Sequence, residues 1–217
     1  MCFAGACTLS FCFSLGLPVL GCLLLACYRA ILVVVGWVSL MCALSFLSGF
    51  PAVGFSGSRS LLPCSVAALR FVSRFVSPGA SVFVGCARGA DGLARSLFPG
   101  ASVFSVASGV WGRGRGAFAG RSVACVRAVA SASGCWVSFP CSPCPAGLLP
   151  SSSSSRCFGG FGSGSWASLA FAVGLGVPCL VFLPPAVPVP VGWPLVAVGG
   201  GWFSFRPASV SQLSLFA

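Results

Sequence analysis

From residue 51 onward, short apolar runs alternate with longer stretches whose apolar positions recur every three or four residues. The short runs, bounded by glycine, serine and proline, indicate strands, and the longer stretches indicate helices. We predict strands at 51–56, 81–85, 101–107, 134–139 and 177–183, and helices at 61–76, 91–98, 117–131 and 166–175. Because strands and helices alternate, the sheet is expected to be mostly parallel.

This alternation predicts an α/β fold, with a mostly parallel sheet of about five strands and helices on both of its faces. The domain is expected at 51–185, between a hydrophobic N-terminal segment at 1–50 and a tail at 186–217 that is rich in proline, valine and tryptophan. The tail is expected to hold a short strand at 202–205 and to be frayed elsewhere. The stretch 140–162 is rich in proline, serine and glycine and is expected to be a long loop.

The first 50 residues are almost entirely apolar. Two runs, Leu9 to Cys27 and Ala30 to Phe50, are each long enough to span a bilayer. A hairpin of two spans would leave the main domain in the cytoplasm, because all arginines but Arg29 follow the second run. The alternative is that translation starts at Met41 and leaves a compact cytoplasmic domain. Both interpretations stay open, and membrane association through residues 9–50 is expected only under the first.

The chain carries 12 basic residues, all arginine, against one acidic residue, for a net charge of +11. Such an excess indicates an anionic partner, and arginine suits bidentate contacts to phosphate or carboxylate. A coding bias toward arginine is the alternative explanation. With no histidine and Asp91 as the single acid, the chain lacks the usual triads and general bases. We therefore expect no catalytic residue and no cofactor.

The 14 cysteines are scattered through apolar runs, as expected for small core residues. Cys141 and Cys144 form the one CxxC pair, and only Cys135 and Cys157 are placed to complete a zinc tetrad with them. We expect no metal site, and any redox role of Cys141 and Cys144 stays open.

Glycine- and serine-rich turns follow the first two predicted strands and precede the last predicted helix. The carboxyl ends of parallel strands meet at one edge of a sheet, where backbone N–H groups and helix dipoles form anion sites. We therefore predict a ligand site at this edge. Its expected residues, with an arginine from the third helix, are Gly57, Ser58, Arg59, Gly85, Arg88, Gly89, Asp91, Arg121, Gly162, Ser163, Gly164 and Ser165.

Three motifs, taken in order, resemble the SLOG superfamily, which includes the DNA-processing protein A and Lonely Guy families. Gly57-Ser58-Arg59 is the first, Gly85 to Asp91 is similar to the "ARGID" turn of the DNA-processing proteins, and Gly162 to Ser165 resembles the "SGT" or "GGxGT" turn. The likeness covers Ala52 to Leu183 and is nearer to small uncharacterised bacterial members. It implies a Rossmann-like fold and a nucleotide-type pocket.

Three functions follow as hypotheses. The first is binding or sensing of a nucleotide or nucleotide-derived small molecule without catalysis. The second is binding of single-stranded DNA, for which Trp111 and Phe118 are the aromatic residues near arginines. The third is hydrolysis of phosphoribohydrolase type, but Ser168 stands where Lonely Guy enzymes carry their catalytic Glu. The sequence leaves the oligomeric state unpredicted.

Overall fold

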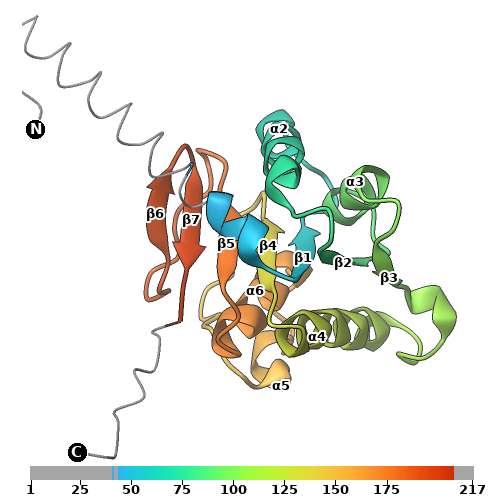
Figure 1. The fold of residues 1–217 in the computed structure, drawn as a ribbon. Helices are drawn as coiled ribbons and strands as arrows, with labels where there is room; N and C mark the ends of the chain where they lie inside the picture. Colours follow the sequence, from blue (N-terminus) through green and yellow to red (C-terminus); the bar gives the residue numbers. More distant parts are fainter. Residues whose placement is uncertain (1–40, 42–43, 208–217) are drawn as a thin grey trace, which may run out of the picture.

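The structure of the protein is a computed structural model that describes residue 41 and residues 44–207 of the 217. A seven-stranded sheet in the order β3-β2-β1-β4-β5-β7-β6 forms its centre (Figure 1). The strands are β1 (Ala52–Gly57), β2 (Ser81–Gly85), β3 (Ser102–Phe104), β4 (Cys135–Phe139), β5 (Cys179–Phe182), β6 (Val196–Gly199) and β7 (Trp202–Phe205).

The five strands from β3 to β5 are parallel, and β7 and β6 extend the sheet in antiparallel fashion. From β1 the chain moves outward through β2 to β3, returns to β4 on the other side of β1, and then continues to β5. The direction of winding therefore reverses between β1 and β4. At such a reversal the loops after the two strands lead away from each other and leave a crevice.

Helices cover both faces of the sheet (Figure 1). The helices α2 (Pro63–Val72) and α3 (Ala90–Leu97) lie on one face, and α4 (Arg115–Ser131), α5 (Ser154–Cys157) and α6 (Gly164–Gly174) on the other. The structure also has three single-turn 3-10 helices, η1 (Phe46–Gly49), η2 (Ser73–Phe75) and η3 (Val106–Ser108). The α/β class, the mostly parallel sheet and its two helical layers are as predicted.

The core divides into two layers because neighbouring strand residues point to opposite faces. In β1, Val53 and Phe55 belong to the layer under α2 and α3. Gly54 faces α4 and α6 and receives the ring of Trp136, which a Cβ at this position would overlap. Strand β4 is buried on both faces, as its nearly continuous apolar sequence predicts.

The sheet has seven strands where about five were expected. The short strand predicted at 202–205 is β7, and its hairpin partner β6 forms in the stretch that was expected to be frayed. Three consecutive glycines from Gly199 to Gly201 with positive φ make the tight turn between these strands. Trp202 then packs into the core. The stretch before β6 is rich in proline and valine, so the sequence shows no clear strand pattern at β6.

Smaller corrections concern the ends of elements. Strand β3 ends at Phe104, because Ser105 caps η3 by accepting a hydrogen bond from Ala107 N. The helix predicted over 61–76 is α2 followed by η2, and the long loop at 140–162 contains the short helix α5.

Leu44 and Leu47 are fully buried in the layer under α2 and α3, so the described domain begins before residue 51. The apolar run at 9–27 and most of the run at 30–50 lie outside the described residues. Among the helices that the structure describes, none has both the length and the apolarity to cross a membrane.

Candidate functional site

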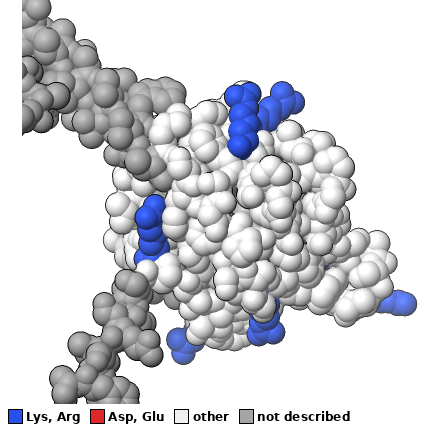
Figure 2. Space-filling model, viewed as in Figure 1, with Lys and Arg blue, Asp and Glu red and all other residues white. Residues whose placement is uncertain are grey.

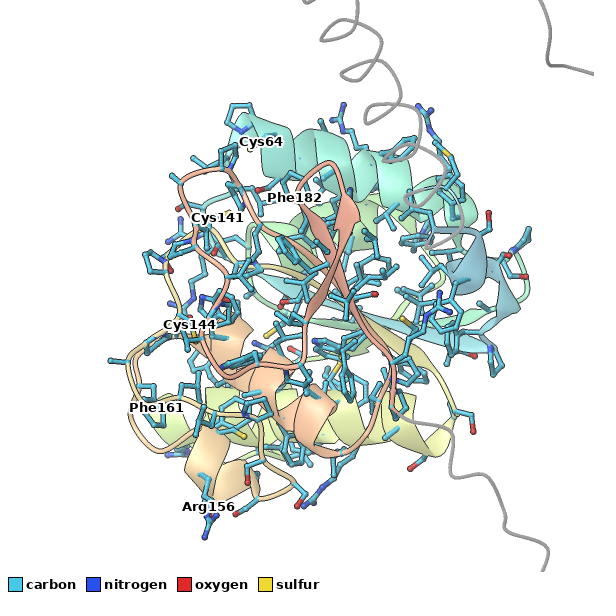
Figure 3. The ribbon with its side chains drawn as sticks, turned by 90° about the vertical axis from the view of Figure 1, so that its left-hand side faces the viewer. Cys64, Cys141, Cys144, Arg156, Phe161 and Phe182 are labelled. Carbon is cyan, nitrogen blue, oxygen red and sulfur yellow. The ribbon has the colours of Figure 1, made fainter. Side chains whose placement is uncertain are left out.

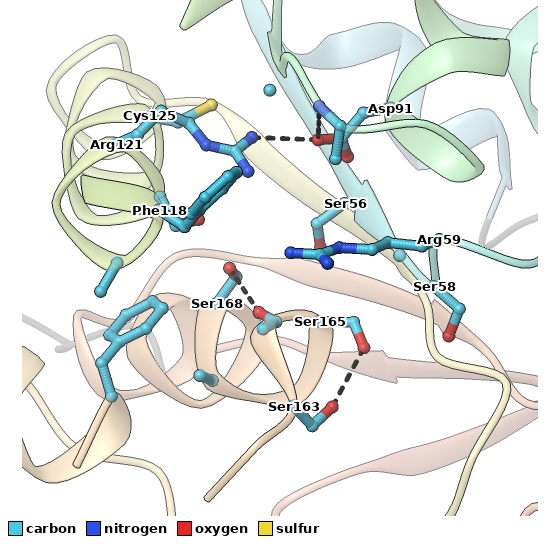
Figure 4. Close-up of a pocket in the computed structure, with 18 of the residues that line it drawn as sticks. Ser56, Ser58, Arg59, Asp91, Phe118, Arg121, Cys125, Ser163, Ser165 and Ser168 are labelled. Atoms are coloured by element: carbon cyan, nitrogen blue, oxygen red, sulfur yellow. Dashed lines mark hydrogen bonds and ion pairs between the residues drawn. The ribbon is translucent and has the colours of Figure 1, made fainter. Parts of the chain in front are cut away.

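A cavity of about 820 Å³ opens at the carboxyl ends of β1, β2 and β4, where the strand order reverses. The turn after β1, the β2–α3 turn, one side of α4 and the first turns of α6 all contribute to its wall (Figure 4). This is the sheet edge that the sequence predicts. Gly57, Ser58, Arg59, Gly85, Asp91, Arg121, Gly162, Ser163, Gly164 and Ser165 line the cavity.

The turn after β1 is fixed by backbone contacts on two sides. Ser58 N donates to Phe139 O at 3.0 Å, and Ala90 N donates to Ser58 O at 3.1 Å. The Ser58 hydroxyl accepts a hydrogen bond from Cys141 N at 2.8 Å. Gly57 is needed because a Cβ there would lie 2.6 Å from the Cβ of Ala90. Gly57 and Ser58 therefore shape the turn that carries the next residue.

That next residue, Arg59, is exposed and reaches over the cavity toward α4 (Figure 4). Its Cζ atom lies 5.5 Å from the centre of the Phe118 ring, which is a cation–π contact. The guanidinium thus stands at the mouth of the cavity. Because it faces solvent, its hydrogen-bond donors are available to an anion that enters.

On the β2 side, Asp91 and Arg121 form a buried ion pair in which Arg121 Nη1 donates to Asp91 Oδ2 at 3.0 Å. Asp91 Oδ2 also accepts from Ala87 N at 3.3 Å. Arg95 donates to the carbonyl oxygens of Gly85 and Ala87 and holds the β2–α3 turn in place. Burial raises the pKa of the Asp91 carboxyl above its ordinary value, although Arg121 acts in the opposite direction.

The Arg121 guanidinium packs directly against Gly85, where any Cβ would overlap it. Its Nε atom is buried and has no hydrogen-bond partner among the described residues. The single acidic side chain of the protein is therefore held by an arginine, and this side of the cavity carries no uncompensated negative side chain.

The N-terminus of α6 forms the opposite wall. Ser163 is the N-cap residue, and its hydroxyl lies 3.3 Å from that of Ser165. The first backbone N–H groups of a helix have no partner within the helix, and the helix dipole adds partial positive charge there. No acidic residue occupies this turn. An anion in the cavity would meet these donors and the Arg59 guanidinium, which lines the same cavity.

Two predicted residues do not line the cavity. Arg88 is exposed and lies outside the wall. Gly89 has φ of 75° and packs against the backbone of Arg59, so it supports the β1 turn and does not line the cavity. Trp111, weighed as a stacking residue, also lies outside the wall and packs against Phe104 at 6.2 Å between ring centres.

The structure adds residues that the sequence analysis did not select. Ser56 Oγ donates to Ser138 Oγ at 3.1 Å and accepts from Trp136 Nε1 at 3.1 Å, so a small polar network lies under the cavity. The sequence could have indicated these residues, because a serine stands out within a nearly continuous apolar strand. Ser168, at the position compared with a catalytic Glu, donates to Gly164 O at 2.8 Å within its own helix.

The CxxC pair lies beside the cavity and not in it. Cys141 and Cys144 are labelled in Figure 3. Cys141 Sγ is 3.4 Å from Ser65 Oγ at the start of α2. Burial raises the pKa of Cys144 to about 11, which keeps its thiol protonated at neutral pH. In the described part of the chain these cysteines form no disulfide, and no three Cys, His, Asp or Glu residues group as metal ligands.

Searches of protein-family models, of curated proteins and of solved structures gave no match to the chain.

Proposed function

We propose that this protein binds a nucleotide or nucleotide-derived ligand at the carboxyl edge of its parallel strands and does so without catalysis. One observation carries the proposal. The exposed guanidinium of Arg59 and the N-terminus of α6 both line the same cavity. Both features attract phosphate, the first by charge-assisted hydrogen bonds and the second by N–H groups and dipole.

The strand order supports assigning the fold to the Rossmann-like class. The order β3-β2-β1-β4-β5 is the one in which doubly wound proteins bind nucleotides at the reversal point. Here the cavity lies at that point, between the turns that follow β1 and β4. The proposed fold class and the proposed ligand are therefore consistent with each other.

Three features favour binding over hydrolysis. The single acidic residue, Asp91, is buried and paired with Arg121. The hydroxyl of Ser168 is committed to a carbonyl in its own helix. The chain also has no histidine, the side chain that most often activates water. Chromatography of nucleoside monophosphates after incubation tests this part, and release of free base that Asp91→Asn abolishes would overturn it.

Calorimetric titration with AMP, ADP, ADP-ribose and a cyclic dinucleotide tests the binding proposal. We expect saturable binding of at least one, weakened roughly tenfold to a hundredfold by Arg59→Ala, because a hydrogen bond to a charged group contributes about 1.5–3 kcal/mol. Arg59→Lys should recover only part of the loss, since an ammonium lacks the planar fork.

Arg74→Ala is the matched control, because it removes an equal charge from an exposed residue outside the cavity. Its affinity should equal that of the wild type. Absence of binding by every ligand at millimolar concentration, or equal losses in Arg59→Ala and Arg74→Ala, would contradict the proposal.

Single-stranded DNA is a second candidate because the net charge is +11. In Figure 2, however, the arginines of the visible face lie in separate places and form no continuous stripe. An oligonucleotide titration at several salt concentrations separates the two functions. A steep loss of affinity with salt would support nucleic-acid binding, and a flat response or no binding would exclude it.

A further inference from the structure

Several aromatic residues line the cavity. Phe118 projects from α4, and Phe158 and Phe161 come from the segment between α5 and α6. Phe158 and Phe161 are partly buried against the core layer under α4 and α6, whereas Phe118 is 40% exposed. The wall that Phe118 forms is therefore open to a ligand, and two further rings line the same cavity.

Phe118 is in contact with the residue proposed to bind phosphate. The Cζ atom of Arg59 lies over its ring at 5.5 Å from the ring centre. For a planar group to fit between them, the guanidinium and the phenyl ring must lie about 7–8 Å apart, which is twice the ~3.5–4.0 Å optimal separation of carbon atoms. Arg59 is exposed, so a modest shift of its side chain would open that space.

We infer that Phe118 and Arg59 form a stacking clamp for a planar heteroaromatic ring, so that the site takes a purine or pyrimidine nucleotide and discriminates against a bare sugar phosphate. This inference rests on the proposed function. Bases stack on aromatic rings and on arginine planes with little regard to sequence, because every base has a π face. The phosphate then lies on the α6 side of Arg59, and the base lies on the Phe118 side.

Calorimetry with two probes tests the clamp. AMP carries both base and phosphate, and ribose 5-phosphate carries the phosphate alone. We expect Phe118→Leu to weaken AMP roughly tenfold or more, in line with measured losses on removing a stacking ring, and to leave ribose 5-phosphate unchanged. Phe118→Tyr keeps the ring and should retain the wild-type affinity for AMP. Thermal melting of both variants checks folding, which should be unaffected at this exposed position.

The other outcomes overturn the clamp in different ways. Equal losses for AMP and ribose 5-phosphate in Phe118→Leu would mean that the ring only positions Arg59. Unchanged affinity for AMP would mean that the ring makes no contribution, while the proposed function stands. If the wild type binds AMP and ribose 5-phosphate equally tightly, the site recognises the phosphate and does not recognise the base. Failure of the wild type to bind any nucleotide would remove the proposed function and the clamp together.

Discussion

Arg121 Nη1 donates to Asp91 Oδ2 at 3.0 Å, and this buried contact joins α4 on one face of the sheet to α3 on the other. Both side chains are more than nine-tenths buried. The pair sits past the end of β2, where Gly85 leaves room for the guanidinium. It closes one side of the candidate ligand cavity and neutralises the only acidic side chain of the protein.

Replacing Arg121 by Met should strongly destabilise the protein at neutral pH. The Asp91 carboxylate would be left buried without its cation, which costs about 3–5 kcal/mol for pairs of this kind. Chemical denaturation monitored by circular dichroism measures the loss. The double variant Arg121→Met with Asp91→Asn should recover most of it, because the unpaired charge is gone. A loss in the double variant equal to the sum of the losses in Arg121→Met and in Asp91→Asn would show that the two residues are not coupled.

The stability of the wild type should fall as pH rises through the pKa of Asp91. Burial raises this pKa above its ordinary value of 3.8, so the folded state binds the proton more tightly than the unfolded state. The stability that Asp91 protonation contributes is then fully present below the pKa of Asp91 in the unfolded state. It is lost as pH rises through the pKa of Asp91 in the folded state.

Denaturant midpoints measured across the acid range test this dependence. The chain has no histidine and no other acidic side chain, so few other groups titrate there. Asp91→Asn removes the titration and should give a flatter profile. A wild-type profile that rises with pH over the same range would mean that Arg121 outweighs burial and lowers the pKa.

Gly85→Ala should destabilise the protein by about 1–3 kcal/mol, as overpacking of a filled core does. The added Cβ would overlap the Arg121 guanidinium and the Asp91 carboxylate, so one of them must move. Gly79→Ala is the control, because a Cβ there meets no atom within 4 Å. Thermal melts of the two variants should differ clearly, and similar melts would show that the ion pair tolerates displacement.

Leu47→Ala should destabilise the domain by about 2–5 kcal/mol, the usual cost of emptying a fully buried leucine site. Leu47 has no exposed surface and packs in the layer under α2 and α3. Ser48→Ala, at an exposed neighbour, should change stability by less than about 0.5 kcal/mol. If Leu47→Ala leaves the stability of the domain unchanged, the residues before 51 do not belong to the unit that unfolds cooperatively.

The sequence predicted those strands that are buried on both faces of the sheet and whose apolar residues are bounded by glycine or serine. Strand β4 is the clearest example, since a nearly unbroken apolar run at 134–139 leaves few alternatives to a central strand. Strand β6 was missed because Val196–Gly199 is largely exposed and follows a stretch dense in proline. An edge strand gains its structure from its neighbour β7, and no local pattern records that pairing.

The sequence predicted part of the candidate site, and the packing of the folded chain decided the rest. Local pattern placed the turns at Gly57, Gly85 and Gly162 at the ends of secondary-structure elements, and parallel topology then brought them to one edge. Whether each residue faces the cavity depended on packing. Arg88 and Gly89 belong to the same turn as Gly85, yet they do not line the cavity.

The long-range partners were decided by the tertiary structure alone. Asp91 and Arg121 are 30 residues apart, and the contact between Arg59 and Phe118 depends on how α4 crosses the sheet. The bonds of Ser56 to Ser138 and Trp136 depend on the register between β1 and β4. Periodicity along a chain reports the burial of each residue, but register and helix crossing arise only when the layers pack.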